Sequence, residues 1–247
     1  MSILNYLKKT IDKKGAAYIV LIDPDKKNNQ SIEKIVSLGN NSGVDAFFIG
    51  GSLIMDSEYN RRVRDIKNKS KIPIILFPGG VNQINPYFDA MLFTSIISGR
   101  NPHYLIGEQV IAAPIVKDLE IETIPTGYIL VDGGSVSMVQ VMSGTIPLPM
   151  QKIDAIIAHA LAGQYLGKKM IYLEAGSGAK YPVENNIIKA VKDVLNIPLI
   201  IGGGLSSPEI VNEKVIAGAS VIVTGTIIET ESTIMNEIAD AVHWKMK

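Results

Sequence analysis

The residues best suited to chemistry in this sequence lie in one short segment, Tyr172-Leu173-Glu174-Ala175-Gly176-Ser177-Gly178. An apolar run there ends in a single carboxylate and passes directly into a glycine-rich turn. Burying an unpaired carboxylate is costly, so a strand that served only for packing would not be expected to end in Glu174. In an alternating strand, Tyr172 and Glu174 share one face. We therefore interpret the segment as a general base beside an anion-binding turn.

Two further glycine-rich turns follow apolar runs, at Gly202-Gly203-Gly204 and at Gly225-Thr226. A phosphate can approach the main chain closely only where no Cβ intervenes. Barrel enzymes often bind phosphate at such turns, through backbone N–H groups and the start of a short helix. Tight strand-to-helix turns also require glycine, but the repetition at three strand ends favours a phosphate site.

A possible metal site follows the first apolar run, at Asp23-Pro24-Asp25-Lys26. Strand alternation places Asp23 on the same face as Ile19 and Leu21, so its carboxylate should project at the rim. Mg²⁺ prefers hard oxygen ligands and typically takes one or two protein carboxylates, with water and substrate phosphate completing the shell. Either aspartate could instead cap the helix expected near Ser31 or form an Asx turn. We favour the metal role for Asp23 and leave both roles open for Asp25.

Ser52 follows Gly50-Gly51 at the end of the second apolar run. Its hydroxyl could be an oxygen ligand near Asp23. Serine is also a common helix N-cap, and a helix is expected to begin at Leu53. Taken alone, Ser52 is better explained as the cap.

Strand-like and helix-like patterns alternate along the whole chain, with no linker that would divide it. Eight such units in 247 residues predict a TIM (β/α)8 barrel of the α/β class, as a single domain over 1–247. A doubly wound sheet also alternates in this way, but a barrel gathers the glycines and acids after the strands on one rim. The expected strands are 18–23, 46–50, 72–77, 90–95, 127–131, 170–174, 198–202 and 220–224. The expected helices are 31–40, 53–68, 103–112, 151–167, 184–195, 208–217 and 231–244, and the stretch after the third strand is too irregular to assign.

The composition excludes several classes of function. The 24 Lys and Arg residues balance 24 Asp and Glu residues, so we expect no nucleic-acid partner. The absence of cysteine excludes disulfides, thiolate catalysis and zinc–thiolate sites. The first residues lack the apolar run of a signal peptide, and no apolar stretch approaches the roughly 20 residues that span a bilayer. We therefore expect a cytoplasmic protein without a transmembrane segment.

The other candidate groups carry less information. His103, His159 and His243 do not group with acids at a spacing typical of metal sites or catalytic triads, so histidine catalysis is not supported. The segment from Ser95 to Pro114 is long for a strand-to-helix connection. It is best explained as an outer helix, and its apolar residues could also form a lid or a wall for an apolar substrate.

Taken together, the motifs resemble the geranylgeranylglyceryl phosphate synthase family, which includes the heptaprenylglyceryl phosphate synthases. The resemblance covers nearly the whole chain and is highly specific. Its motifs are Leu21-Ile22-Asp23-Pro24-Asp25-Lys26, Phe48-Ile49-Gly50-Gly51-Ser52, Tyr172 to Gly178, Ile201-Gly202-Gly203-Gly204 and Val223-Thr224-Gly225-Thr226.

The resemblance implies a modified TIM barrel that joins sn-glycerol 1-phosphate to a polyprenyl diphosphate, with geranylgeranyl diphosphate favoured, through an ether bond. Pyrophosphate is released, Mg²⁺ is the cofactor and the enzyme forms homo-oligomers. Asp23 and Ser52 would then hold Mg²⁺, and Glu174 would accept the proton of the glycerol hydroxyl. Glycerol 1-phosphate would lie along Tyr172, Leu173, Glu174, Ala175, Gly176, Ser177 and Gly178, with its phosphate at Gly203, Gly204, Gly225 and Thr226.

One residue departs from part of that family. Some members have a lysine two residues before the metal-binding aspartate, where this chain has Leu21. The substrate contact of that lysine cannot be transferred to this sequence. The difference indicates the archaeal-type second branch of the family rather than the bacterial heptaprenyl branch.

Two other classes of function remain as alternatives. One is a different phosphate-binding barrel enzyme, such as a sugar-phosphate isomerase or aldolase, in which Glu174 would remove a proton from carbon. A Schiff-base aldolase would need a lysine at a strand end inside the barrel, whereas Lys26 lies beyond a strand and Lys168 and Lys169 precede one. The other alternative is a non-catalytic sensor of a phosphorylated metabolite, which would bind its ligand without turnover.

Overall fold

The core of the protein is a closed ring of eight parallel strands, which confirms the TIM barrel expected from the sequence. The computed structural model describes residues 1–25 and 29–246. Each strand pairs with the next, and β8 closes the ring by pairing with β1. The strands are β1 (Ala17–Ile22), β2 (Ala46–Ile49), β3 (Ile74–Leu76), β4 (Ala90–Ile96), β5 (Glu122–Leu130), β6 (Met170–Glu174), β7 (Leu199–Gly202) and β8 (Val221–Thr224).

The strands bury both of their faces, which explains why they appear in the sequence as nearly continuous apolar runs. In β1, Ala17 and Ile19 point into the barrel interior, while Tyr18 and Val20 pack in the layer between barrel and helices. The interior also contains the aromatic rings of Phe48, Tyr128 and Tyr172. Because successive side chains alternate between the two faces, the last residue of a strand can point into the mouth of the barrel.

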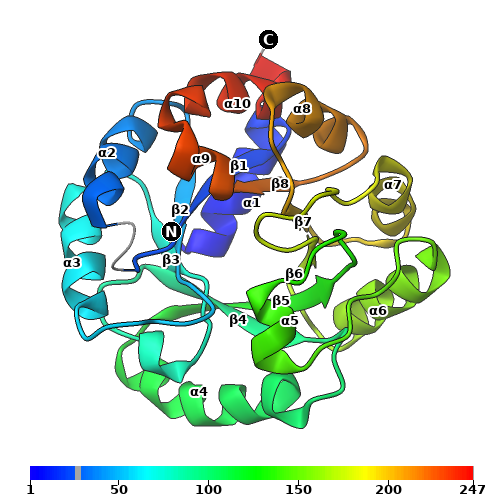
Figure 1. Ribbon diagram of the computed structural model, residues 1–247, viewed down its shortest axis with the longest axis horizontal. Helices are drawn as coiled ribbons and strands as arrows, with labels where there is room; N and C mark the ends of the chain where they lie inside the picture. Colours follow the sequence, from blue (N-terminus) through cyan, green and yellow to red (C-terminus); the bar gives the residue numbers. More distant parts are fainter. Residues whose placement is uncertain (26–28, 247) are drawn as a thin grey trace.

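Helices surround the barrel (Figure 1). Among the described residues, they are supplemented by short 3-10 segments, η2 (Val81–Gln83), η4 (Ser232–Ile234) and η5 (Trp244–Met246), and by one π-helical segment, η3 (His103–Gly107). The helices are α1 (Ile3–Lys14), α2 (Asn29–Gly39), α3 (Tyr59–Lys69), α4 (Glu108–Asp118), α5 (Met138–Ser143), α6 (Ile153–Tyr165), α7 (Asn185–Val194), α8 (Pro208–Ile216), α9 (Thr226–Thr230) and α10 (Met235–Val242).

The regular barrel is modified after β3, where the sequence was too irregular to assign. Only the 3-10 turn η2 (Val81–Gln83) lies between β3 and β4, so this unit has no α-helix of its own. In Figure 1, α3 and α4 are neighbours in the outer ring with this short segment between them. Met91 and Phe93 on the outer face of β4 line a cavity together with Ala112 of α4.

Helix α1 closes the end of the barrel at which the strands begin. Its Leu7 is fully buried in the interior cluster. The N–H groups of Ile3 and Leu4 donate to the carboxylate of Glu122, the first residue of β5, at 2.5 and 2.9 Å. With this end closed, access to the barrel interior is from the opposite rim, where the glycine-rich turns lie.

Several expected element boundaries were wrong. The helix expected from Leu53 begins only at Tyr59, so Ser52 is not its N-cap. Strand β5 begins at Glu122 rather than at residue 127, and helix α4 continues past Pro114. The expected helix over 231–244 is divided into η4 (Ser232–Ile234), α10 and η5 (Trp244–Met246). Helices α1, α5 and α9 were not expected.

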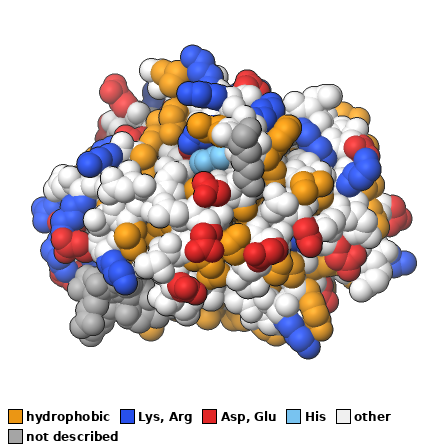
Figure 2. Space-filling view, turned by 90° about the horizontal axis from the view of Figure 1, so that it is seen from above, with side chains coloured by type: hydrophobic (Ala, Val, Ile, Leu, Met, Phe, Trp, Pro, Cys, Tyr) orange, Lys and Arg blue, Asp and Glu red, His pale blue; other side chains and the backbone are white. Residues whose placement is uncertain are grey.

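The surface agrees with the balanced composition. Acidic and basic side chains are interspersed on the face seen in Figure 2. No helix within the described part of the chain is long and apolar enough to cross a membrane.

Candidate active site

A cavity of 590 Å³ opens at the carboxyl ends of the barrel strands. Loops that follow strands on both sides of the barrel line the cavity, so it lies across the rim. Its polar wall comes from the loops after β6, β7 and β8, and its apolar wall comes from the region of β3, β4, α4 and α5. The polar wall includes Glu174, Ser177, Gly178, Gly203, Gly204, Gly225 and Thr226.

Glu174 is a buried carboxyl group at the end of β6, with 7% of its surface exposed. Its Oε1 accepts the backbone N–H of Gly176 at 2.7 Å, and its Oε2 lies beside the hydroxyl of Tyr172. Burial raises the pKa of Glu174 to about 7, although the hydrogen bonds from Gly176 and Tyr172 act in the opposite direction. A carboxylate with a pKa near neutrality is well suited to accept a proton.

Aromatic rings form the floor beneath Glu174. The ring of Phe77 stacks on Tyr172 with centroids 5.3 Å apart, and Tyr128 lies 5.4 Å from Tyr172. Burial, together with the nearby charge of Glu174, raises the pKa of both tyrosines well above their ordinary value. Tyr172 therefore keeps its proton and donates, which leaves Glu174 as the group able to accept one.

The glycine turns of the polar wall adopt conformations that most other residues avoid. Gly176, Gly178, Gly203 and Gly204 have positive φ angles of 105°, 67°, 82° and 70°. A Cβ on Gly203 would overlap Oε1 of Glu174, so this glycine also allows the loop after β7 to approach the loop after β6. These turns bring backbone against the cavity without side chains, as a phosphate site requires.

The loop after β8 completes this wall. The hydroxyl groups of Ser177 and Thr226 lie 3.4 Å apart, so the loops after β6 and β8 meet. Gly225 has a φ of −132°, a value open to any residue, and its nearest neighbour is the side chain of Leu21. The structure thus brings the predicted phosphate-binding turns to one side of the cavity.

The side chain of Asp23 lies against the loop that carries Ser52. A Cβ on Gly51 would stand 2.6 Å from Oδ1 of Asp23, and this oxygen also accepts the N–H of Asp25 at 3.2 Å. Ser52 lines the cavity, whereas Asp23 is not among the lining residues. The expected capping role of Ser52 is excluded, because α3 begins seven residues later.

The residues around Asp23 fit a magnesium ion that is shared with a substrate. Within residues 1–25 and 29–246, no three His, Cys, Asp or Glu side chains gather into a protein-only metal cage. Mg²⁺ does not need one, because it commonly takes one or two protein oxygens and fills its remaining positions with water and phosphate. The hydroxyl of Ser52 in the cavity wall and the carboxylate of Asp23 against the neighbouring Gly51 are a suitable donor set.

The opposite wall of the cavity is mainly apolar. The segment from Ser95 to Pro114 contributes Ile96, Tyr104 and Ala112 together with the polar Glu108 and Gln109, so it supplies both part of the outer helix α4 and part of this wall. This wall extends into the space left by the missing helix after β3. Its other apolar residues include Phe77, Val81, Ile84, Met91, Phe93, Val139 and Met142.

Some residues named from the sequence do not present side chains to the cavity. The side chains of Leu173 and Ala175 belong to the outer hydrophobic layer, so only their backbone could reach a ligand. Lys26 lies outside the described residues. None of the three histidines lines the cavity; His243 instead contacts Asp45, with Nε2 2.9 Å from Oδ2.

Sequence reasoning missed other residues of the site. Phe77 and Tyr128 appeared only as parts of apolar runs, and nothing in their local spacing distinguished them from packing residues. Leu21 does line the cavity, so an apolar side chain stands where part of the resembled family has a lysine. Of the described lining residues, Lys180 alone is a lysine or arginine.

Comparison with known proteins gives consistent results. The chain is 42% identical to a geranylgeranylglyceryl phosphate synthase of Chitinophaga pinensis over 236 residues, covering 94% of each chain. It is 38% identical to the enzyme of the same name from Methanosphaera stadtmanae, covering 98% of this chain and 100% of that relative.

Solved structures agree with these sequence relatives. The crystal structure of (S)-3-O-geranylgeranylglyceryl phosphate synthase from Thermoplasma acidophilum, in complex with its substrate sn-glycerol-1-phosphate, superimposes with a TM-score of 0.92. The two chains are 34% identical, and the match covers 99% of each. The family model described as the PcrB family matches residues 8–243, and the chain therefore belongs to the PcrB family.

Proposed function

We propose that this protein is a prenyltransferase that joins the 3-hydroxyl of sn-glycerol 1-phosphate to a polyprenyl diphosphate, releasing pyrophosphate. Geranylgeranyl diphosphate is the favoured donor, because the relatives at about 40% identity carry its name. The reaction belongs to the synthesis of ether phospholipids. The observation that carries the proposal is the position of Glu174 between a glycine-rich polar wall and a long apolar wall in one cavity.

The two walls suit the two substrates. The loops after β6, β7 and β8 offer backbone N–H groups to the phosphate of glycerol phosphate, without a Cβ in the way. The apolar wall offers a hydrocarbon chain a surface from which water is excluded. Holding the hydroxyl and the allylic carbon in contact reduces the entropic part of the barrier by several kcal/mol.

Glu174 acts as the general base of the reaction. The allylic carbon–oxygen bond breaks, and its electron pair leaves with the diphosphate. The oxygen of the glycerol 3-hydroxyl forms the new bond to that carbon, and the hydroxyl proton passes to the Glu174 carboxylate. Oε1 accepts the N–H of Gly176 and Oε2 lies beside the Tyr172 hydroxyl, and a carboxylate oxygen that accepts one hydrogen bond keeps a second lone pair for the incoming proton. A positioned base contributes a factor of roughly 10²–10⁴.

The cofactor in this proposal is Mg²⁺, with Asp23 and Ser52 as its protein ligands. When bound, Mg²⁺ would stabilise the negative charge that develops on the departing diphosphate. The support is the position of Ser52 in the cavity wall and the approach of Asp23 to the backbone at Gly51.

A direct test is to incubate the protein with sn-glycerol 1-phosphate, geranylgeranyl diphosphate and Mg²⁺ and to measure the product by mass spectrometry. The expected product has the mass of the prenyl ether of glycerol phosphate. Asp23→Asn should lose most of the activity, and so should the wild type in excess chelator. Binding of both substrates without any ether product would instead support a sensor, and full activity of Asp23→Asn in chelator would refute the metal assignment.

Two sequence-based expectations have not been tested. The cytoplasmic location and the homo-oligomeric state both stay predictions. The apolar residues exposed on α4 and α5, including Val110 and Val141, are consistent with self-association.

A further inference from the structure

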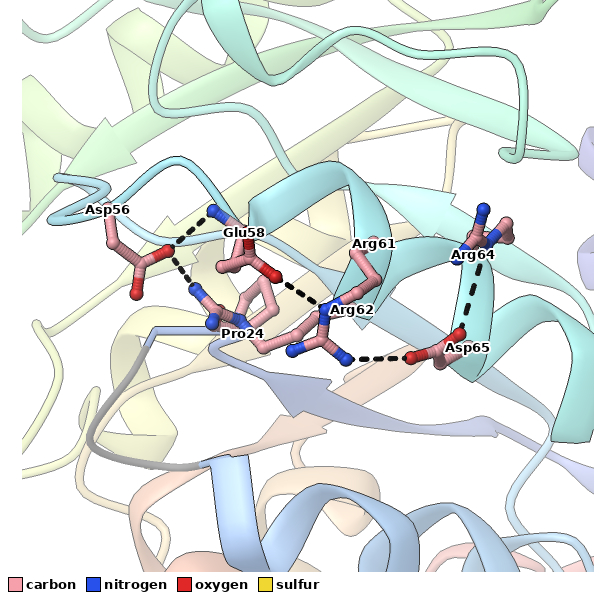
Figure 3. Close-up of polar contacts among 7 residues, drawn as sticks. All are labelled: Pro24, Asp56, Glu58, Arg61, Arg62, Arg64 and Asp65. Carbon is pink, nitrogen blue, oxygen red and sulfur yellow. Dashed lines mark hydrogen bonds and ion pairs between the residues drawn. The ribbon is translucent and has the colours of Figure 1, made fainter.

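Arg62 is an unusual residue of helix α3, because its cationic side chain is buried. The side chain of Arg62 is only 5% exposed, whereas the side chains of Arg61 and Arg64 on the same helix are 47% and 51% exposed. Figure 3 shows the three arginines and their partners. A buried guanidinium is costly unless its donors are satisfied, so its contacts indicate its role.

The guanidinium of Arg62 connects two loops of the active-site rim. Its Nε donates to the backbone carbonyl of Pro24 at 2.6 Å, and its Nη2 donates to Oδ1 of Asp56 (Figure 3). Pro24 directly follows Asp23, and Asp56 lies four residues beyond Ser52. One side chain therefore holds both the loop after β1 and the loop after β2.

The Asp56 side chain also anchors the start of α3. Its Oδ1 accepts the backbone N–H of Glu58 at 2.9 Å, in addition to the donor from Arg62. The loop that begins at Ser52 is thus fixed to the helix that carries Arg62. On the cavity side, the same two loops meet where Asp23 approaches Gly51.

We propose that Arg62 is a positioning residue that sets the relative placement of Asp23 and Ser52 for a divalent cation bound with diphosphate. This inference rests on the proposed function, and specifically on its metal site. Residues that orient metal ligands without touching the metal typically change metal affinity about 10-fold to 100-fold when replaced. The planar fork of arginine can hold a carbonyl and a carboxylate at once, which the single ammonium of lysine does less well.

The inference is tested with Arg62→Met and Arg62→Lys, compared with Arg61→Met. Arg61 is a matched control on the same helix, because its ion pairs with Glu58 and Asp65 are exposed. Binding of Mn²⁺ in the presence of inorganic pyrophosphate is measured by electron paramagnetic resonance. Binding of sn-glycerol 1-phosphate is measured by calorimetry, and folding is monitored by circular dichroism.

We expect Arg62→Met to weaken Mn²⁺ binding and to raise the half-saturating Mg²⁺ concentration in turnover, each by roughly 10-fold or more. Its affinity for sn-glycerol 1-phosphate should stay within about twofold, because that substrate binds at β6 to β8. Arg62→Lys should be intermediate, and Arg61→Met should match the wild type. If Arg62→Met does not fold, metal and glycerol phosphate binding of Arg62→Lys is compared with that of the wild type and Arg61→Met instead.

Two results would overturn the inference. One is a folded Arg62 variant with wild-type dependence on Mn²⁺ and Mg²⁺. The other is an equal loss of affinity for metal and for glycerol phosphate, which would indicate general destabilisation of the rim. A wrong assignment of the metal site would give a different result, because the wild type and Asp23→Asn would then bind Mn²⁺ equally in the presence of pyrophosphate.

Discussion

At the scale of single residues, the chemistry depends on how Glu174 is buried. Burial disfavours the ionised form of Glu174, while the Gly176 N–H and the Tyr172 hydroxyl hold its carboxyl group in one orientation. The ring of Phe77 stacks on that of Tyr172 beneath this carboxyl group. The result is a carboxyl group whose affinity for a proton matches neutral pH, as the proposed role of general base requires.

The protonation of Glu174 predicts how the rate depends on pH. Because the base must be ionised to accept a proton, kcat/KM should rise with pH through about 7, the pKa of the free protein's Glu174. Glu174→Gln should lower kcat by roughly 10²-fold or more and remove this rising limb. Steady-state rates from pH 5 to pH 9 provide the measurement.

The folding of the Glu174→Gln variant provides the control. The pKa of Glu174 is raised on folding, so the wild type loses stability as pH rises from about 4.5 through about 7. A neutral amide avoids this loss, so at pH 8 the variant should unfold at a temperature equal to or above that of the wild type. Full turnover in a folded Glu174→Gln protein would remove Glu174 as the base.

At the scale of elements, the glycine turns allow the backbone of one loop to lie close to a side chain of another segment. Gly203 combines a φ of 82° with a position at which a Cβ would overlap Oε1 of Glu174. Gly167, in the loop between α6 and β6, has almost the same φ of 84° but nothing within 4 Å of its Cβ position. A side chain at Gly167 would therefore cause backbone strain alone, whereas a side chain at Gly203 would also overlap Glu174.

This contrast predicts different outcomes for two alanine substitutions. Gly203→Ala should displace the Glu174 carboxyl and lower kcat/KM for sn-glycerol 1-phosphate by at least about 10-fold. Gly167→Ala should cost about 1 kcal/mol in stability with unchanged kinetics. Kinetics and chemical denaturation of both variants would test this. Equal kinetic effects of the two substitutions would contradict a specific role for Gly203.

Elements were predictable from sequence where local patterns agreed with tertiary packing. Strand β6 ends at Glu174 as expected. Helix α1 was missed although its signals are present, with Ser2 as N-cap and Gly15 at the C-cap. Strand β5 was expected only over 127–131, whereas it begins at Glu122. In the structure Gly127 makes room for packing, since a Cβ there would stand 2.9 Å from Ile97.

The site was predictable only in part, for a physical reason. Turns and strand ends that carry glycines and acids are local features, so the polar wall could be proposed from sequence. The burial of Arg62 and the stacking of Phe77 on Tyr172 join segments far apart in the chain. No local pattern distinguishes such residues from an exposed arginine or an ordinary core phenylalanine.

At the scale of the whole molecule, Asp45 joins the two ends of the chain to the barrel. Its carboxylate contacts Lys14 of α1 at 2.5 Å, the N–H of Tyr18 at 2.8 Å and Nε2 of His243 at 2.9 Å. Burial alone would raise the pKa of Asp45, but these hydrogen bonds outweigh it and hold the pKa below the ordinary value of 3.8.

The lowered pKa of Asp45 predicts how stability depends on pH. The stabilisation is fully present above the ordinary pKa and is lost as pH falls through the lowered value. Asp45→Asn should therefore cost on the order of 3 kcal/mol at pH 7, and this difference should shrink below pH 4. Urea denaturation at several pH values provides the measurement. A difference that stays constant down to pH 3 would contradict this account.

The central claim is prenyl transfer to sn-glycerol 1-phosphate, and pyrophosphate release tests it most directly. Initial rates are compared with geranylgeranyl diphosphate and Mg²⁺, using sn-glycerol 1-phosphate, sn-glycerol 3-phosphate or no acceptor. The account predicts rapid release only with sn-glycerol 1-phosphate in the wild type, and a rate near the no-acceptor background in Glu174→Gln. Release that is equally fast with all three, or absent with every acceptor, would contradict it.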